Sequence, residues 1–331
     1  MNEEKRYEDC RLCPRRCGVN RVRGEKGFCG ETASLRIAAA VLHRGEEPPI
    51  AGENGSGAVF VSGCNLGCAF CQNFQISRQG LGRVVSIDEF AAICLALQEK
   101  GAENVNIVTG THATPALARG VAAAKARGLT VPVLWNSSAY EDEDTLALLQ
   151  GLVDIFLPDM KTLDAETARA FLNAPDYPEV ASRAVLAMLN MAGNLSYARE
   201  DGEKMLSGVV VRHLVLPGRL DSTRAVIEWF AENAEGRALF SLMTQYTPMG
   251  PRAPNRYINA SEYETLLKWL DEFGVRGYYQ ELSPDADWLP DFSRFNPFSS
   301  ELSTPVWNAY AGSALHKIND DVAVVQEGTQ G

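Results

Sequence analysis

Residues 58–71 read AVFVSGCNLGCAFC, an apolar strand followed directly by three cysteines. Cys64, Cys68 and Cys71 have the spacing CxxxCxxC, and the aromatic residue Phe70 precedes the last of them. Three thiolates can hold three irons of a cubane [4Fe–4S] cluster and leave the fourth iron open, whereas an electron-transfer cluster normally has a cysteine on each iron. The stretch therefore predicts a cluster with one iron free for chemistry.

Other interpretations fit these cysteines less well. Structural zinc usually has four protein ligands, and no fourth Cys or His lies near the trio. The first residues lack the charged and apolar regions of a secretory signal, so we expect an intracellular protein whose thiols stay reduced. Buried, inert cysteines would not need this spacing.

Length and charge limit the class of protein. The 331 residues, 46% of them hydrophobic, are enough for one large domain with an appendage. A net charge of −11 argues against nucleic acid as a general partner, because it would repel phosphates. No apolar run approaches the length of a membrane span, so we expect no membrane partner and a cytoplasmic location.

Strand and helix patterns alternate along the chain. Apolar runs predict strands at residues 58–61, 105–108, 131–134, 153–157, 209–216, 239–242 and 277–279. Helices are expected at 87–100 and 115–127, and after a capping box formed by Ser261 and Glu264. The pattern predicts an α/β fold: a full or partial parallel (β/α) barrel with a small N-terminal cysteine-rich, metal-binding segment. We expect this segment over 1–45, the barrel over 46–285 and an irregular C-terminal extension over 286–331.

Polar residues follow the predicted strands, where parallel barrels place their chemistry. The cysteine loop follows the first strand, and the next six strand ends carry the following residues: Thr109, Gly110, Thr111 and His112; Trp135, Asn136, Ser137 and Ser138; Asp159 and Lys161; Arg212 and His213; Gln245 and Tyr246; Gln280 and Glu281. We expect these residues to share one rim.

From about residue 55 to 281 the chain resembles the radical S-adenosylmethionine (SAM) superfamily. Within it, the chain is most similar to the activating enzymes of glycyl radical enzymes, in particular the PflX-type homologues of pyruvate formate-lyase activating enzyme. The resemblance is carried by the cysteine motif and by the runs GAVFVSGCNL (57–66), LPDMK (157–161) and VRHLVLPG (211–218).

This resemblance implies cofactors, chemistry and partners. The open iron would chelate the amino and carboxylate groups of SAM, and a flavodoxin or ferredoxin-type donor would reduce the cluster. Reductive cleavage would yield methionine and a 5′-deoxyadenosyl radical that abstracts a hydrogen atom from a substrate. The implied substrate is a glycine Cα–H in a glycyl radical enzyme.

The resemblance also implies roles for site residues. Phe70 would line the adenine side of SAM, and Asp159 and Lys161 would hold it at the fourth strand end, where Lys161 offers charge-assisted donors to a carboxylate. Arg212 would lie near the methionine carboxylate, with a salt bridge to an acid of the rim as its alternative. Asn136 is a further candidate for cofactor binding.

The second strand end departs from the family pattern. Its usual Gly-Gly-Glu-like turn is replaced here by Thr109-Gly110-Thr111-His112, so the acid that receives the SAM ammonium is missing. Carbonyl groups around Gly110, assisted by Thr109 or Thr111, would take its place. His112 is either a proton carrier or substrate contact, or a residue bonded to backbone.

Four further cysteines form a second predicted metal site. Cys10, Cys13, Cys17 and Cys29 lie in a short segment that could not fold alone. Zinc there would be structural, while a second iron–sulfur cluster could relay an electron.

Two alternatives to glycyl radical activation remain open. One is a radical SAM modifier or maturase of another protein, a peptide or a small molecule, which the altered second turn and the N-terminal cysteines favour. The other is a non-catalytic iron–sulfur or zinc scaffold, against which Asp159, Lys161 and Arg212 argue.

Overall fold

The computed structural model of the protein describes residues 5–198, 204–282 and 288–310. The strands are β1 (Arg36–His43), β2 (Ser56–Val61), β3 (Arg83–Val84), β4 (Val105–Val108), β5 (Val133–Ser137), β6 (Ile155–Pro158), β7 (Ser196–Tyr197), β8 (Met205–Leu214), β9 (Leu239–Met243), β10 (Gly277–Tyr279) and β11 (Ser303–Asn308). The α-helices are α1 (Lys5–Glu8), α2 (Pro48–Ala51), α3 (Phe74–Ser77), α4 (Ile87–Glu99), α5 (Thr114–Ala126), α6 (Glu143–Leu146), α7 (Ala165–Thr167), α8 (Tyr177–Ala192), α9 (Leu220–Asn233) and α10 (Ala260–Glu272).

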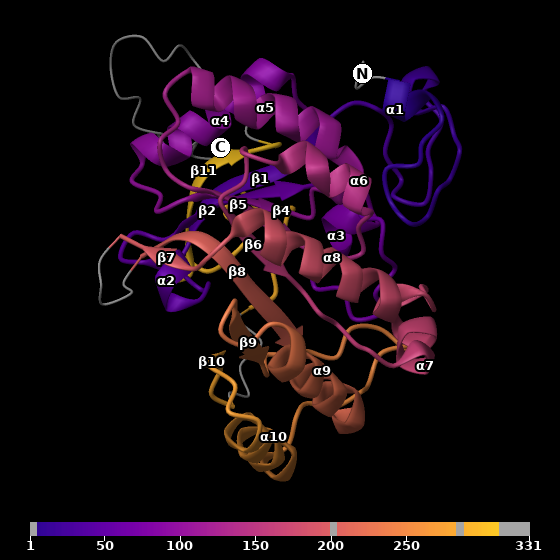
Figure 1. Ribbon diagram of the computed structural model, residues 1–331. Coiled ribbons are helices and arrows are strands. Elements are labelled where there is room, and N and C mark those ends of the chain that lie inside the picture. Colours follow the sequence, from indigo (N-terminus) through magenta and orange to yellow (C-terminus); the bar gives the residue numbers. More distant parts are fainter. Residues whose placement is uncertain (1–4, 199–203, 283–287, 311–331) are drawn as a thin grey trace, which may run out of the picture.

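The strands form one curved sheet in the order β10-β9-β8-β6-β5-β4-β2-β1-β11, with β3 beside β1 and β7 beside β8. The strands from β2 to β10 along this order are parallel, while β1 and β11 are antiparallel to their neighbours. Helices follow the outer side of the sheet (Figure 1). The fold is therefore a partial parallel (β/α) barrel, and the predicted fold class is confirmed.

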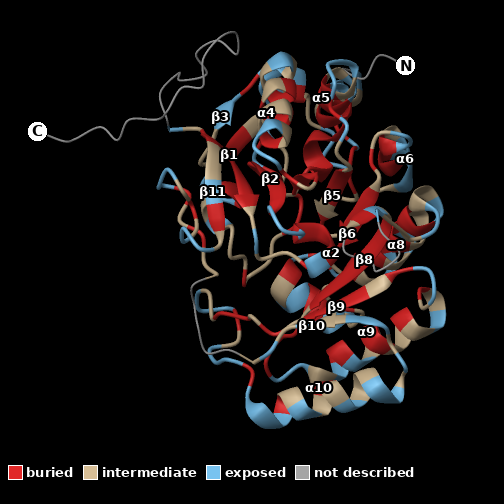
Figure 2. Ribbon diagram, turned by 90° about the vertical axis from the view of Figure 1, so that its left-hand side faces the viewer, coloured by how far each residue is buried: buried red, intermediate tan, exposed pale blue. Residues whose placement is uncertain are grey.

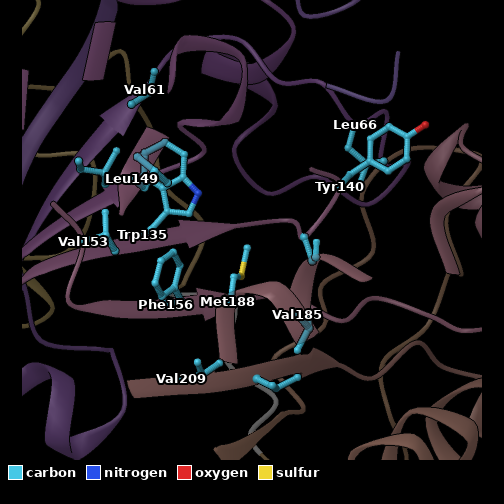
Figure 3. Close-up of a cluster of buried hydrophobic side chains, with 14 of the residues drawn as sticks. Val61, Leu66, Trp135, Tyr140, Leu149, Val153, Phe156, Val185, Met188 and Val209 are labelled. Atoms are coloured by element: carbon cyan, nitrogen blue, oxygen red, sulfur yellow. The ribbon is translucent and has the colours of Figure 1, made fainter. Parts of the chain in front are cut away.

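Alternation along the strands decides which side chains face the helices. Val105 and Ile107 of β4 belong to the main hydrophobic core, whereas Asn106 between them lies on the other face of the strand. Strands and inner helix faces are mostly buried (Figure 2). Figure 3 shows Val185 and Met188 of α8 beside the strand residues Phe156 and Val209. Helix packing thus fixes the outer face, while the inner face carries polar residues such as Asn106 together with smaller apolar clusters that include Leu134, Ile155 and Leu157.

Three parts of the structure differ from the sequence prediction. Helix α10 is capped by Asn259 with Glu262, two residues before the predicted capping box. Strand β1 was not predicted, because its sequence RIAAAVLH contains an alanine run that does not favour a strand. Strand β11 lies in the extension that was predicted to be irregular, so that prediction is wrong for residues 303–308. Pro305 is tolerated in β11 because β11 is the last strand in the sheet order. Among the described residues, no helix is long and apolar enough to cross a membrane.

Candidate active site

The cysteine loop follows β2 and is fixed by backbone contacts. Gly63 has a φ of +85°, and a Cβ there would lie 2.5 Å from the Glu31 side chain, so only glycine fits. The N–H groups of Gly67 and Ala69 donate to carbonyls of Leu172 and Phe171 at 3.1 and 2.7 Å. The loop is therefore held from both sides before any metal binds.

The three cysteines of the loop line a cavity of about 550 Å³. The Leu66 N–H donates to the Cys64 Sγ at 3.3 Å, a contact that stabilises a thiolate. Burial raises the pKa of Cys64 to about 11 and that of Cys68 to about 12, although the nearby Lys161 charge lowers both. Metal binding must therefore displace the thiol protons.

Each cysteine of a cubane binds a different iron, so cluster ligands need not converge on one point. In the described part of the chain, no three His, Cys, Asp or Glu side chains converge closely enough to hold a single metal ion. The donor set of three thiols facing one cavity fits a cluster with an open iron.

Asp159 and Lys161 line the same cavity and pair with each other. The Lys161 Nζ lies 2.7 Å from the Asp159 Oδ2, and the two side chains are 14% and 23% exposed. Burial is the largest effect and lowers the pKa of Lys161, but Asp159, Cys68 and Tyr177 together raise this pKa above its usual value. The ion pair therefore lies in the same cavity wall as the cluster cysteines.

Tyr177 of α8 anchors the turn that carries this ion pair. Its hydroxyl oxygen lies 2.6 Å from the Asp159 carbonyl and 2.9 Å from the Ser138 carbonyl, which share its one proton, and it accepts from the Lys161 N–H at 2.9 Å. Tyr177 is fully buried, so this backbone anchor is shielded from water. The sequence does not indicate this anchor, since a tyrosine at a helix start has no distinctive spacing from the turn.

The other predicted cofactor-binding residues divide into two groups. Phe70, Thr109 and Asn136 line the cavity. Thr109 has a φ of +63°, an uncommon conformation for a β-branched residue that implies backbone strain next to the cavity. Gly110 does not line it and packs against Trp135, since a Cβ on Gly110 would lie 2.4 Å from the indole.

His112 lies outside the cavity lining and is bonded to backbone. Its Nε2 lies 2.8 Å from the Ser62 carbonyl, and its own carbonyl accepts from Arg21 Nη1 at 2.6 Å. Burial first, and then the Arg21 charge, lower the pKa of His112 to about 3. Of the two interpretations, the contacts are those of the backbone-bonded residue.

Arg212 lines the cavity, but two acids already bind its guanidinium. Its Nε donates to Glu47 Oε1 at 2.8 Å, and its Nη2 contacts carboxylate oxygens of Glu46 and Glu47. The alternative interpretation of Arg212, a salt bridge to an acid, therefore describes its contacts in this structure. The sequence analysis missed both glutamates, which follow β1 and lie about 165 residues away from Arg212.

A third acid that the sequence did not indicate, Glu141, holds two strand ends together. Glu141 is buried and accepts from Trp135 Nε1 at 2.9 Å, Ser137 Oγ at 2.5 Å and Thr111 Oγ1 at 3.0 Å. Burial raises the pKa of Glu141, and the three donors oppose this. Glu141 thus joins the turn after β4 to the end of β5, and it does not itself line the cavity.

The segment that carries the four N-terminal cysteines contacts the cysteine loop through Arg15, whose Nε donates to the Asn65 carbonyl at 2.8 Å. Cys10, Cys13 and Cys29 are buried and Cys17 is exposed. Burial raises the pKa values of Cys13 and Cys29, while the Arg15 backbone lowers that of Cys13 and, after the Arg21 charge, the Glu31 backbone lowers that of Cys29. At Cys13, Cys29 and Cys64 alike, the backbone that acts on the sulfur belongs to the residue two positions after the cysteine.

A family model and several known proteins match parts of this chain. Residues 58–230 match the family model of the Radical SAM superfamily. The uncharacterized protein MJ0674 of Methanocaldococcus jannaschii is 29% identical over 281 residues, which are 81% of this chain and 76% of that protein. Among solved structures, Streptococcus suis SuiB is 11% identical, with a TM-score of 0.49. The match covers 66% of this chain and 47% of SuiB, so the chain spans about half the length of SuiB. A domain of pyruvate-formate lyase-activating enzyme from Bacteroides vulgatus is 11% identical with a TM-score of 0.37, over 51% of this chain and 91% of that domain.

Proposed function

This chain belongs to the Radical SAM superfamily, and we propose that it cleaves SAM reductively at a [4Fe–4S] cluster on Cys64, Cys68 and Cys71 and activates a protein substrate. One observation carries the proposal: the three cysteines, Phe70 and the Asp159–Lys161 ion pair line a single cavity at the carboxyl ends of parallel strands. A non-catalytic scaffold would not need a buried ion pair beside its cysteines.

The residues of the cavity have separate roles in this proposal. When bound and reduced, the cluster supplies the electron that splits SAM into methionine and a 5′-deoxyadenosyl radical. Lys161 offers N–H donors to the carboxylate of SAM, and Asp159 accepts from a hydroxyl or pairs with a positive charge. Phe70, which is 5% exposed, provides an apolar surface for the adenine and helps to exclude water.

The substrate that we propose is a glycine Cα–H of a glycyl radical enzyme. The support is the similarity of the runs at 57–66, 157–161 and 211–218 to the activating enzymes, most closely those of the PflX type. A flavodoxin or ferredoxin-type protein in the cytoplasm would supply the electron. Glycyl radical formation requires no protein acid or base for the cleavage of SAM itself, which agrees with a neutral His112 outside the cavity lining.

We propose a second metal centre on Cys10, Cys13, Cys17 and Cys29. The backbone contacts to the sulfurs of Cys13 and Cys29 support it, because N–H donors stabilise thiolates. Zinc would make this centre structural and a second iron–sulfur cluster would make it a relay. Elemental analysis of the Cys64, Cys68 and Cys71 triple-alanine variant distinguishes them, because only the N-terminal centre then remains.

Anaerobic reconstitution tests the main proposal. The reconstituted protein is reduced with dithionite, and 5′-deoxyadenosine is quantified with SAM alone and with a candidate glycyl radical enzyme. We expect 5′-deoxyadenosine from the wild type and none from the triple-alanine variant. Transfer of deuterium from a glycine-labelled protein into 5′-deoxyadenosine would identify the substrate. Fully loaded, reduced protein that binds SAM without ever cleaving it would refute the catalytic proposal.

A further inference from the structure

Two adjacent glutamates enter the barrel between β1 and β2. Strand β1 ends at His43, which pairs with Ser56, the first residue of β2, and the connection carries Glu46 and Glu47. The cysteine loop begins after the other end of β2, six residues or about 17 Å away along the strand. In Figure 1, α2 after the glutamates and α3 after the cysteine loop lie at opposite ends of the central strands. We call Glu46 and Glu47 the acidic pair.

The acidic pair is buried and held by residues of several strands. The side chains of Glu46 and Glu47 are 10% and 6% exposed, and both contact the Arg212 guanidinium of β8. Asn106 Nδ2 of β4 donates to Glu46 Oε1 at 3.0 Å. The pair is therefore a built part of the cavity wall and not a flexible surface patch.

Two polar atoms next to the acidic pair lack a hydrogen-bond partner. Asn106 is fully buried, and while its amide nitrogen binds Glu46, its Oδ1 has no partner among the described residues. The His43 Nδ1 is also buried without a hydrogen bond, 3.7 Å from Glu46 Oε1. Buried polar atoms are usually satisfied, so Asn106 Oδ1, an acceptor, points to a donor that is absent from the protein itself.

The charges of the cavity wall do not balance. Asp159 and Lys161 neutralise each other, whereas Glu46 and Glu47 share the single guanidinium of Arg212. Arg44 is a further cation on the described cavity wall, but it is exposed and its Nη2 donates to Thr304 on β11. One buried negative charge is therefore left over, and burying such a charge is costly without a cation.

An apolar wall adjoins the acidic pair. A Cβ on Gly45 would lie 2.8 Å from the Trp288 ring, and the Phe298 ring lies 4.8 Å from that of His43. Trp288 and Phe298 line the cavity together with Glu46 and Glu47. Aromatic surface beside a carboxylate suits a cation on an aliphatic stem, because the stem packs on the rings while the charge reaches the acid.

We propose that the acidic pair binds a cationic side chain of the substrate, a guanidinium or ammonium group on an aliphatic stem. The inference rests on the proposed function, in which SAM occupies the end of the cavity next to the cysteine loop. The substrate would then be anchored by its cation at Glu46 while the reacting carbon faces the cysteine loop. An arginine or lysine near the target residue satisfies this arrangement.

Binding of two matched peptides tests the inference without turnover. Acetyl-Gly-Arg-Gly-amide and its citrulline counterpart have the same shape and differ in charge. Each is titrated by anaerobic calorimetry into reconstituted, SAM-loaded protein without reductant, so that no SAM is consumed. We expect the arginine peptide to bind at least about tenfold more tightly, which is the effect of one charge-assisted hydrogen bond. Glu46→Gln should abolish this preference, and Glu143→Gln on the exposed part of α6 should retain it.

Each contrary outcome is distinct from failure of the proposed function. Equal affinity of the wild type for both peptides, or no measurable binding of the arginine peptide, would overturn the inference even if the enzyme cleaves SAM. A Glu46→Gln variant that loses affinity for SAM alone would assign the acid to the cofactor and also overturn it. The peptide comparison in the wild type needs no variant, so misfolding of Glu46→Gln cannot mask the result. Absence of SAM cleavage on reduction would instead refute the proposed function.

Discussion

Lys161→Met should weaken SAM binding by ten- to a hundredfold without loss of iron. Methionine keeps most of the side-chain volume and removes the charge. The Lys161 ammonium has three N–H donors, of which one goes to Asp159 at 2.7 Å, so two remain for a ligand carboxylate. A hydrogen bond to a charged group contributes about 1.5 to 3 kcal/mol, and about 1.4 kcal/mol corresponds to a tenfold change in affinity.

The assay is a titration of SAM into anaerobically reconstituted protein, with wild type and variants matched in iron content. Lys268→Met, on the exposed side of α10, is the control for the substitution itself. An exposed ion pair contributes at most about 1 kcal/mol, equal to about fivefold. If Lys161→Met changes the affinity by less than this, the reasoning is refuted and Lys161 is only the partner of Asp159.

A second readout separates electrostatics from a general loss of structure. Lys161 lowers the pKa values of Cys64 and Cys68, and Asp159 raises that of Cys68, so both charges act on the cluster site. Reduction adds negative charge to a cluster, so a nearby cation favours it. Lys161→Met should therefore make the midpoint potential more negative, and Asp159→Asn should make it more positive. Shifts of the same sign in both variants would contradict this account.

Three further predictions concern residues around the cavity. Tyr177→Phe removes the anchor of the Asp159–Lys161 turn and leaves buried backbone groups unpaired. The free energy of unfolding, measured by denaturant titration, should fall by about 1 to 3 kcal/mol. An unchanged value would contradict the role of Tyr177 as an anchor. The folded-state pKa of His112 lies near 3, below its usual value of about 6.5, so the unfolded chain binds the proton more readily than the folded chain does. The free energy of unfolding should therefore fall as the pH falls from about 6.5 towards 3, by up to about 1.4 kcal/mol per pH unit. His112→Gln should make that profile less steep, while His213, whose pKa burial lowers to about 4, keeps part of the slope. A wild-type profile that is already flat would refute the assignment. Cys10→Ala, combined with alanine at the other three N-terminal cysteines, should lower stability and remove one metal centre while the iron of the cysteine loop stays, as measured by elemental analysis.

Local spacing and parallel-strand topology made much of the site predictable. The cluster motif lies within eight residues, and the carboxyl ends of parallel strands share one edge, so Asn136, Asp159 and Lys161 could be assigned to the rim of Cys64. Gly110 and His112 follow a strand end just as Thr109 does, yet they do not line the cavity. Strand ends predict the edge of the sheet, but the turn that follows decides which side chains face inward.

Contacts between distant segments could not be predicted from the sequence. Glu46 and Glu47 meet Arg212 only because β1 runs antiparallel beside β2 and returns the chain into the barrel. The sequence of β1 does not favour a strand, so nothing indicated that return. The position of the acidic pair is therefore a property of the tertiary fold, as is the anchor formed by Tyr177.

The N-terminal segment and the cysteine loop form one structural unit. The buried apolar cluster of the segment is small and consists of Tyr7, Cys10 and Leu12, too little for an independent core. The segment docks instead on the loop: the Arg15 Nε donates to the Asn65 carbonyl at 2.8 Å, and a Cβ on Gly63 would lie 2.9 Å from the Cys29 carbonyl. A metal that organises the four N-terminal cysteines would thus also shape the backbone next to Cys64. The two proposed centres are therefore coupled through packing, whether or not an electron passes between them.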